Sequence, residues 1–263
     1  MEIFDSFASV VKSLTDEEIA TANSLERLNM ARSEVRGREL RVQYAPFDHV
    51  NRDAKIVIVG MTPGLFQARQ ALLAARNALR GGKSNLEAAR AAKVHASFSG
   101  EPMRGNLVAM LDLVGVAKWL GIESTAQLWS DKQQLVHFTS ALRYPVFLDG
   151  ANWSGTPDMV RTPLLRNQLE RHAGQELADL RDALIVPLGP KVSAAMIHVA
   201  QETGLSRDQI LDGLPHPSGA NAERISFFLG RKSDEDCSVK TNTNAISAAR
   251  ANLVEKLDAI LAR

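Results

Sequence analysis

The sequence is poor in several features that would each point to a class of protein. It has one cysteine, Cys237, in 263 residues. A single cysteine excludes a disulfide framework, a cysteine-based zinc site and a four-cysteine iron–sulfur cluster. No apolar run reaches the length of about 18 residues that a transmembrane helix needs, so no membrane partner is expected. Residues 1–5 are acidic where a signal peptide would be basic, which favours a cytoplasmic location.

The chain also lacks an excess of charge of either sign. Its 31 lysines and arginines balance 30 aspartates and glutamates, for a net charge of +1. This balance excludes binding of polyanions by bulk charge, although a local basic face stays open. The apolar fraction of 45% and the charged fraction of 23% are those of an ordinary globular protein. Composition therefore indicates no particular function.

Two apolar runs are the clearest structural signal. Residues 55–59 and 183–189 are each followed by a helical pattern, at about 65–79 and about 190–202. Because a fully apolar strand is buried on both faces, these runs predict a parallel sheet between layers of helices. Further strands are predicted at 40–44, 135–140 and 212–215. Helices are predicted near 105–120, 163–181 and 243–262, with two more within 1–33, where Thr15 and Glu18 form a capping-box pattern.

The alternation of strands and helices predicts the α/β class. We expect a three-layer α/β/α sandwich around a central, mostly parallel four-stranded sheet. The sequence shows no internal repeat or linker, so residues 1–263 are predicted to form a single domain. It would have an N-terminal helical extension (1–39), a core (40–230), a polar loop (230–242) and a C-terminal helix (243–262). The segment Gly82-Lys83-Ser84 lacks the earlier glycine and the preceding strand of a phosphate-binding loop, which indicates a break between helices.

Two small-residue loops follow predicted strands. The first is Gly60-Met61-Thr62-Pro63-Gly64 and the second is His216-Pro217-Ser218-Gly219. Ligands of open α/β sheets bind at the carboxyl ends of strands, and the helix after the first loop could offer its N-terminal amides to an anion. The competing interpretation is a tight turn without a role in the first loop, and a simple helix cap at Ser218 or Asn221 in the second.

Together the two loops resemble the active-site motifs of the uracil-DNA glycosylase superfamily. Residues 60–66 resemble the Gly-Met-Asn-Pro-Gly-x-Phe form of its single-strand-selective branch. Residues 216–219 combine the His-Pro-Ser and Asn-Pro-Ser-Gly forms of its second motif. Three segments between them are similar to family landmarks in the same order, at 97–100, 138–145 and 188–192. The resemblance runs from about residue 40 to residue 230.

The resemblance implies an enzyme that flips a nucleotide out of DNA and hydrolyses its N-glycosidic bond without a metal or a cofactor. His216 would donate a hydrogen bond to the base carbonyl oxygen, where negative charge accumulates. The base-binding residues implied are Met61, Gly64, Phe66, Phe98 and Ser140. The DNA-binding residues implied are Pro63, Lys191, Ser218, Gly219, Asn221 and Arg224, although Arg224 could equally lie on a solvated helix face. No lysine falls in a motif as a Schiff-base nucleophile, so no lyase step is expected.

The sequence departs from the family pattern at two positions. Thr62 stands where the family has a catalytic Asp or Asn, and a threonine hydroxyl can position water but cannot act as a base. The missing carboxylate is therefore expected elsewhere, at Asp149 first, with Asp158 and Glu101 as the other candidates. Ser140 stands where the family has a base-reading Asn. Its shorter side chain leaves extra volume, which favours a substrate other than plain uracil.

Additional segments could shape such a pocket. They are the insertion at 69–96 and the loop at 147–158, in which Trp153 could stack on a base or pack in the interior. The favoured hypothesis is a monofunctional DNA glycosylase for a modified or damaged base that leaves an abasic site. Hypermodified cytosine in bacteriophage DNA, attacked in antiviral defence, is a candidate substrate.

Three alternatives stay open. The first is conventional repair of uracil and other deaminated bases. The second is a catalytically inactive DNA-binding member of the fold. The third is a small-molecule enzyme resembling the α/β hydrolases, which the absence of a Gly-x-Ser-x-Gly elbow disfavours.

Overall fold

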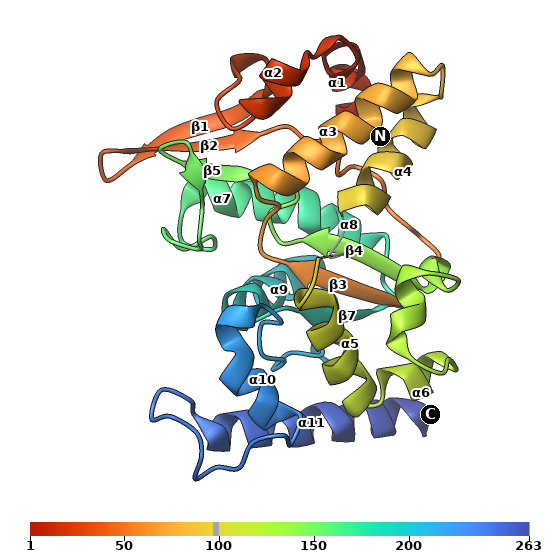
Figure 1. Ribbon diagram of the computed structural model, residues 1–263, viewed down its shortest axis with the longest axis vertical. Helices are drawn as coiled ribbons and strands as arrows, with labels where there is room; N and C mark the ends of the chain where they lie inside the picture. The colour runs from red at the N-terminus through yellow and green to blue at the C-terminus, as the bar shows by residue number, and fades with distance from the viewer. Residues whose placement is uncertain (97–99, 263) are drawn as a thin grey trace. The chain divides into compact units, whose positions relative to one another are not determined.

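The computed structural model describes residues 1–96 and 100–262 of the chain (Figure 1). The chain forms two compact units whose segments alternate along the sequence. Unit 1 comprises Met1–Val50, Gly60–Ser97 and Thr139–Asp179, and unit 2 comprises Asn51–Val59, Phe98–Phe138 and Leu180–Arg263. The predicted single domain and its internal boundaries stay a prediction.

A three-stranded sheet lies mostly in unit 2. Its order is β4 (Val136–Ser140), β3 (Ile56–Gly60) and β7 (Leu184–Pro187). β3 and β7 run parallel, with a register from Ile56↔Leu184 to Val59↔Pro187. Every residue of β3 and β7 is buried, which confirms the prediction drawn from their continuous apolar sequences.

The predicted fourth strand at 212–215 is wrong. These residues, all within the described part, adopt no strand; instead Ile185 makes a single parallel bridge with Ile210. Leu211 N then donates to Ile185 O at 2.8 Å, and pairing ends there. Gly213 has φ +116°, which lies outside the β region, and Pro215 has no N–H to donate.

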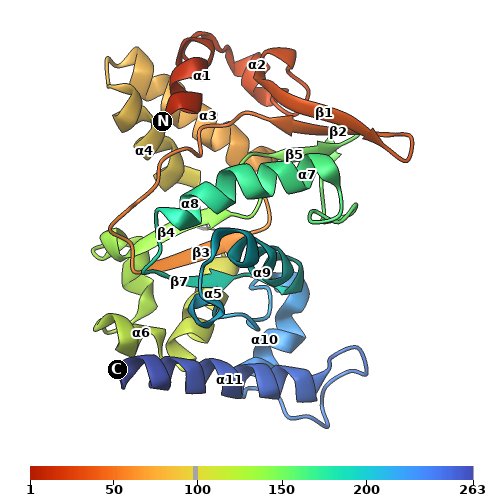
Figure 2. The ribbon, with the colours of Figure 1, turned by 180° about the vertical axis from the view of Figure 1, so that it is seen from behind.

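Helices flank this sheet. Figures 1 and 2 show α5 and α9 on opposite sides of it. Ile56, Ile58 and Val186 of the sheet share a core with Leu107 and Phe228 from the helices. The helices of unit 2 are α5 (Met103–Leu113), α6 (Val116–Leu120), α9 (Pro190–Thr203), α10 (Ala222–Phe228) and α11 (Thr243–Leu261), with short 3-10 turns at Thr125–Trp129, Gln133–Leu135, Arg207–Gln209 and Gly219–Asn221.

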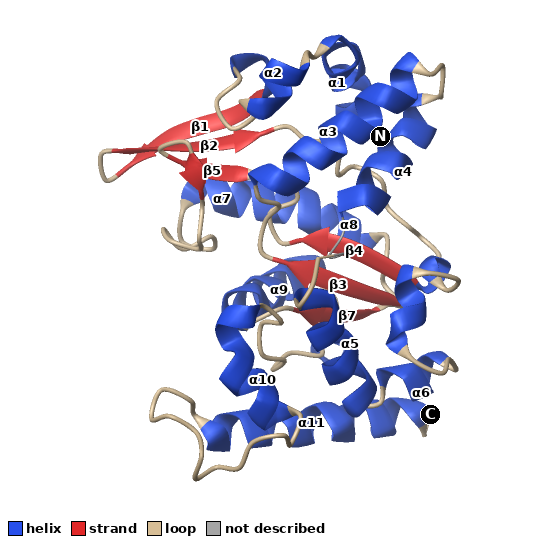
Figure 3. Cartoon of the chain, viewed as in Figure 1, coloured by secondary structure: helices blue, strands red, loops and turns tan. Residues whose placement is uncertain are grey.

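Unit 1 contains an antiparallel sheet (Figure 3), of which the sequence predicted only the strand at 40–44. Its strands are β1 (Asn29–Val35), β2 (Arg38–Gln43), β5 (Val146–Leu148) and β6 (Ala151–Asn152), in that order. The helix expected to reach residue 33 is wrong beyond Ala20, where α2 ends; a short 3-10 turn follows at Glu26–Leu28, and residues 29–33 belong to β1, which pairs antiparallel with β2. Arg36 and Gly37 both have positive φ, the geometry of a two-residue hairpin turn.

The helices of unit 1 include those of the N-terminal segment. They are α1 (Glu2–Ser13), α2 (Asp16–Ala20), a turn at Glu26–Leu28, α3 (Leu65–Arg80), α4 (Asn85–Ala96), α7 (Pro163–Gln168), a π-helix (Leu169–Gly174) and α8 (Gln175–Ala178). The chain between α3 and α4 includes Gly82-Lys83-Ser84, so the predicted break between helices is confirmed. Among the described residues, no helix has both the length and the apolarity to cross a membrane.

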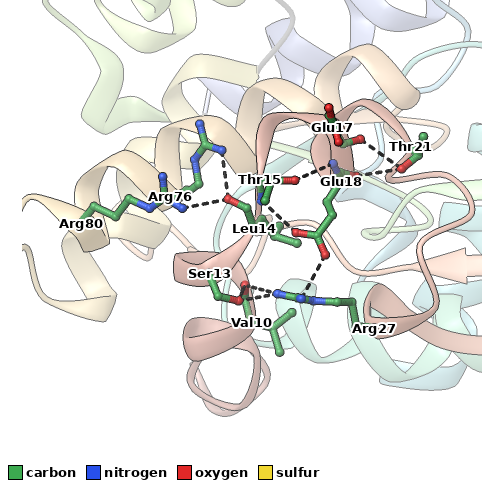
Figure 4. A network of polar contacts seen from close by, with 10 residues as sticks. All are labelled: Val10, Ser13, Leu14, Thr15, Glu17, Glu18, Thr21, Arg27, Arg76 and Arg80. Carbon is green, nitrogen blue, oxygen red and sulfur yellow. Dashed lines mark hydrogen bonds and ion pairs between the residues drawn. The ribbon is translucent and has the colours of Figure 1, made fainter.

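A network of hydrogen bonds and ion pairs connects the N-terminal helices to α3 (Figure 4). The predicted capping box is confirmed: Glu18 N donates to Thr15 Oγ1 at 3.1 Å, and Thr15 N donates to Glu18 Oε2 at 2.8 Å. Arg76 and Arg80 of α3 both donate to Leu14 O, at 3.1 and 2.9 Å. These cations lie where the carbonyl groups at the end of α1 lack helical partners, so they stabilise that helix end.

Candidate functional site

His216 is half-buried in the loop that precedes α10. Ser218 N donates to His216 Nδ1 at 3.3 Å. A backbone amide can only donate, so Nδ1 is an acceptor and the ring proton lies on Nε2. Burial lowers the pKa of His216, which favours this neutral ring. The His216 ring therefore has its hydrogen-bond donor at Nε2–H.

A chain of hydrogen bonds extends from this ring. Ser218 Oγ lies 3.1 Å from His216 Nδ1, and Asn221 Nδ2 donates to Ser218 Oγ at 3.2 Å. Arg224 Nη1 donates in turn to Asn221 Oδ1 at 3.1 Å. Hydrogen bonds in such a chain polarise one another and orient the group at its end. Ser218, Asn221 and Arg224 thus share one network around His216, and their roles as DNA contacts stay predictions.

Neighbouring elements of unit 2 hold the His216 loop in place. A Cβ on Gly189 would lie 3.3 Å from His216 Cβ, and Gly189 has φ +89°, so a side chain there would be both crowded and strained. Asn106 Nδ2 on α5 donates to Pro217 O at 2.9 Å. Sequence reasoning missed Asn106, because an isolated Asn in a helix carries no motif. Lys191 lies exposed in the first turn of α9.

The Thr62 loop in unit 1 is held by the segment that follows β4. Ala141 N donates to Gly60 O at 2.8 Å, and Leu142 N donates to Met61 O at 3.0 Å. Thr62 Oγ1 lies 3.1 Å from Tyr144 O. A carbonyl oxygen can only accept, so the Thr62 hydroxyl donates its proton there. The lone pairs of Thr62 Oγ1 are then the part that can accept a hydrogen bond from water.

The start of α3 differs from the sequence expectation of open amides. Gly64 N donates to Gln67 Oε1 at 3.2 Å, and Leu65 N donates to Asn152 Oδ1 at 2.9 Å. These two donors are satisfied within the protein, so the expected anion site is wrong for them. Phe66 is 68% exposed. Asn152 was not found from sequence, because the β5–β6 hairpin brings it to α3 from 87 residues away.

The first carboxylate candidate is already engaged. Asp149, in the turn between β5 and β6, accepts from Arg38 Nε at 2.6 Å and from Glu39 N at 2.9 Å. Arg38 lowers the pKa of this carboxyl below its ordinary value, so it is a poor base. The contacts of Asp149 therefore support a structural role in the turn and not the predicted catalytic role.

The other two carboxylate candidates also cap local backbone. Asp158 Oδ1 accepts from Val160 N and Arg161 N, both at 2.9 Å. Glu101 accepts from Arg104 Nε and Gly105 N, both at 3.1 Å. These contacts of the three carboxylates are thus with backbone amides and arginine side chains of the protein itself.

The remaining predicted positions are placed as follows. Trp153 is 3% exposed and its Nε1 donates to Pro157 O at 3.2 Å, so the structure supports interior packing for it. Pro63 is buried, whereas Met61 and Ser140 are half-buried. Gly219 is exposed, and a Cβ on it would lie 3.6 Å from Pro102. Phe98 lies outside the described residues.

A group of buried ionisable residues in unit 1 was missed by sequence reasoning. We call it the buried charge cluster; it comprises Asp48, Lys93, Arg143 and Glu176. Arg143 Nε donates to Glu176 Oε2 at 2.7 Å, and Lys93 Nζ lies 3.7 Å from Glu176 Oε1. Burial lowers the pKa of Lys93 to about 8 and raises that of Asp48. No motif marks these residues, because they meet only in the folded chain.

His172, in the π-helix, packs against this cluster and should make stability depend on pH. His172 is 3% exposed, and its ring meets the Tyr144 ring edge-on at 5.0 Å between centroids. Burial, followed by the charge of Arg143, lowers the pKa of His172 from 6.5 to about 4. In the unfolded chain His172 therefore binds a proton as the pH falls below 6.5, whereas in the folded protein it binds one only near pH 4.

We expect this histidine to lower the free energy of unfolding by about 3 kcal/mol as the pH falls through that window. Urea denaturation between pH 7 and pH 4.5 measures the effect, with the His172→Gln variant as the control. An equally steep loss in His172→Gln would show that His172 is not the cause.

Metal chemistry has no evident site in the part of the chain that the structure describes. No group of three or more His, Cys, Asp or Glu side chains there is arranged to hold an ion. The two loops instead offer neutral donors and acceptors.

The fold defines the class of protein: a mixed α/β protein in which β3 and β7 run parallel. Uncharacterized protein YoxB of Bacillus subtilis strain 168 is 36% identical over 197 residues, which cover 74% of this chain and 77% of YoxB. The chain belongs to the YoxB family. No family model matches it. No solved structure matches it either.

Proposed function

We propose that this protein is a monofunctional DNA glycosylase that hydrolyses the N-glycosidic bond of a modified or damaged base. The observation that carries the proposal is the neutral His216 ring, whose Nδ1 accepts from Ser218 N at 3.3 Å. That contact leaves Nε2–H as a fixed donor. A departing base gathers negative charge on its carbonyl oxygen, and a preorganised donor stabilises that charge without reorganisation.

The proposed reaction needs no metal or cofactor. The bond between C1′ and the base nitrogen breaks, and the base leaves with the bonding electron pair. His216 Nε2–H donates to the base carbonyl oxygen as the charge develops. Water then adds to C1′, and the proton it loses balances the charge of the departed base. The products are the free base and an abasic site.

Thr62 has a positioning role in this proposal. Its proton is donated to Tyr144 O at 3.1 Å, so toward water the hydroxyl is an acceptor. It can orient the attacking water but cannot take its proton at neutral pH. The oxocarbenium-like sugar is electrophilic enough to react with a water that is oriented rather than ionised.

The proposed fold is the three-layer sandwich of the uracil-DNA glycosylase superfamily, with four strands in the central sheet. The parallel bridge between Ile185 and Ile210 supports a reduced fourth strand beside β7. The substrate class proposed is a base larger than uracil, because Ser140 replaces the amide that would read uracil. Hypermodified cytosine of bacteriophage DNA fits that description. Antiviral defence in the cytoplasm is the corresponding proposed role.

Base release tests the proposal directly. Purified protein is incubated with DNA that carries uracil, cytosine, hydroxymethylcytosine or glucosylated hydroxymethylcytosine, and abasic sites are counted. We expect abasic sites in the modified DNA and none in unmodified cytosine DNA. Release from uracil DNA alone would favour conventional repair. DNA binding that weakens with salt, without any abasic sites, would indicate an inactive binding member of the fold and contradict the proposal.

A further inference from the structure

The buried charge cluster of unit 1 includes Arg143, which belongs to the segment that holds the Thr62 loop. Three hydrogen bonds join the loop to this segment: Ala141 N to Gly60 O, Leu142 N to Met61 O, and Thr62 Oγ1 to Tyr144 O. The same short segment contains Arg143 and Tyr144. Its backbone therefore faces the loop while two of its side chains are available to anchor it.

The Arg143 side chain provides the first anchor. Its Nε donates to Glu176 Oε2 at 2.7 Å, its Nη2 also contacts Glu176, and Nη2 donates to His172 O at 3.0 Å. Glu176 is 2% exposed, so this charge-assisted contact is shielded from water. Glu176 and His172 belong to α8 and the π-helix, and π-helices occur often at functional sites.

The Tyr144 side chain provides the second anchor. Its hydroxyl donates to Asp48 Oδ1 at 2.8 Å, and Tyr44 OH donates to Asp48 Oδ2 at 3.0 Å. Tyr144 is 1% exposed and Asp48 is 7% exposed. Lys93 Nζ, from α4, completes the charge balance and donates to Phe47 O at 3.1 Å. The anchors of Arg143 and Tyr144 thus come from separate parts of the unit.

We propose that the buried charge cluster is a positioning device for the Thr62 loop. Arg143 and Tyr144 fix the 141–144 backbone, and that backbone fixes the direction in which Thr62 Oγ1 presents its lone pairs. Arg143, Glu176 and Asp48 are positioning residues, because they act through this backbone and not on the substrate. The structural part stands on the contacts alone, and the kinetic part rests on the proposed glycosylase function.

The experiment compares Glu176→Gln and Tyr144→Phe with the wild-type protein. Glu176→Gln removes the charge that holds Arg143, and Tyr144→Phe is a milder variant that removes one hydroxyl. Glu34→Gln makes the same chemical change at an exposed position of β1 and serves as the matched control. Hydrogen exchange is measured at the Ala141 and Leu142 amides, with Val42 of β2 as an internal reference for unit 1.

We expect exchange at Ala141 and Leu142 to become about tenfold faster in both variants while Val42 and the control stay unchanged. Base release should then fall about 10²-fold in kcat with little change in KM, because the substrate still binds while the attacking water is misplaced. Thr62→Ser, which keeps the hydroxyl, should retain activity that Thr62→Val loses.

Two results would overturn the proposal: unchanged exchange at Ala141 and Leu142, or faster exchange with unchanged kcat. Exchange is read without substrate, so it judges the anchoring even if the wild-type protein releases no base. That separate result would count against the proposed function alone.

Discussion

Replacing His216 with alanine should lower kcat for base release by roughly 10²–10³-fold, the usual loss when one preorganised donor is removed. The reason is that Nε2–H, fixed by the contact between Nδ1 and Ser218 N, would no longer stabilise the departing base. His216→Asn keeps an N–H donor and should retain more activity than His216→Ala. DNA binding, measured by fluorescence anisotropy, should change little in either variant.

The pH profile provides a second measurement of the same residue. Protonation of His216 places a proton on Nδ1, which can then no longer accept from Ser218 N. Because burial lowers the pKa of His216, the rate should stay level as the pH falls through 6.5 and decline only further into the acid range. A rate that rises on acidification through pH 6.5 would show that the charged ring is the active form.

Replacing Arg143 with methionine should lower the free energy of unfolding by about 3–5 kcal/mol. Glu176 is 2% exposed, so its charge is shielded from water. Without Arg143, its remaining cationic partner would be Lys93, 3.7 Å away, which must also balance the charge of Asp48. The double variant Arg143→Met/Glu176→Gln restores the balance of charge. It should therefore lose less stability than the sum of the two single variants.

An exposed ion pair provides the matched control for that measurement. Arg38 and Asp149 are paired at 2.6 Å, with side chains that are 54% and 48% exposed. Arg38→Met should cost less than about 1 kcal/mol, because water screens such a pair. Equal losses for Arg38→Met and Arg143→Met in urea denaturation would show that the buried charge cluster contributes no special stability.

Local patterns predicted much of the secondary structure. Strands β3 and β7 were found because every residue in each is buried, which gives a continuous apolar sequence. Helices α3 and α9 were predicted from the helical patterns that follow these two strands in the sequence. The capping box of α2 was found because Thr15 and Glu18 bond within three residues of each other. Such signals lie within a few neighbouring residues and do not need the rest of the fold.

Predictions failed where a distant segment decided the outcome. Residues 29–33 form a strand because β2 pairs with them. The segment 212–215 is not a strand, because Gly213 leaves the β region after one bridge. The carboxylate of Asp149 looked available in sequence, but Arg38 pairs with it from 111 residues away.

The sequence by itself determined the α/β class, the buried parallel strands β3 and β7, and the candidates Thr62 and His216. Tertiary structure decided what these side chains can do. The contact with Ser218 N sets the tautomer of His216, and Tyr144 O sets the direction of the Thr62 hydroxyl. The buried charge cluster was invisible in sequence for the same physical reason. A hydrogen bond or an ion pair depends on which atoms the fold brings within about 3 Å, and separation along the chain does not determine that distance.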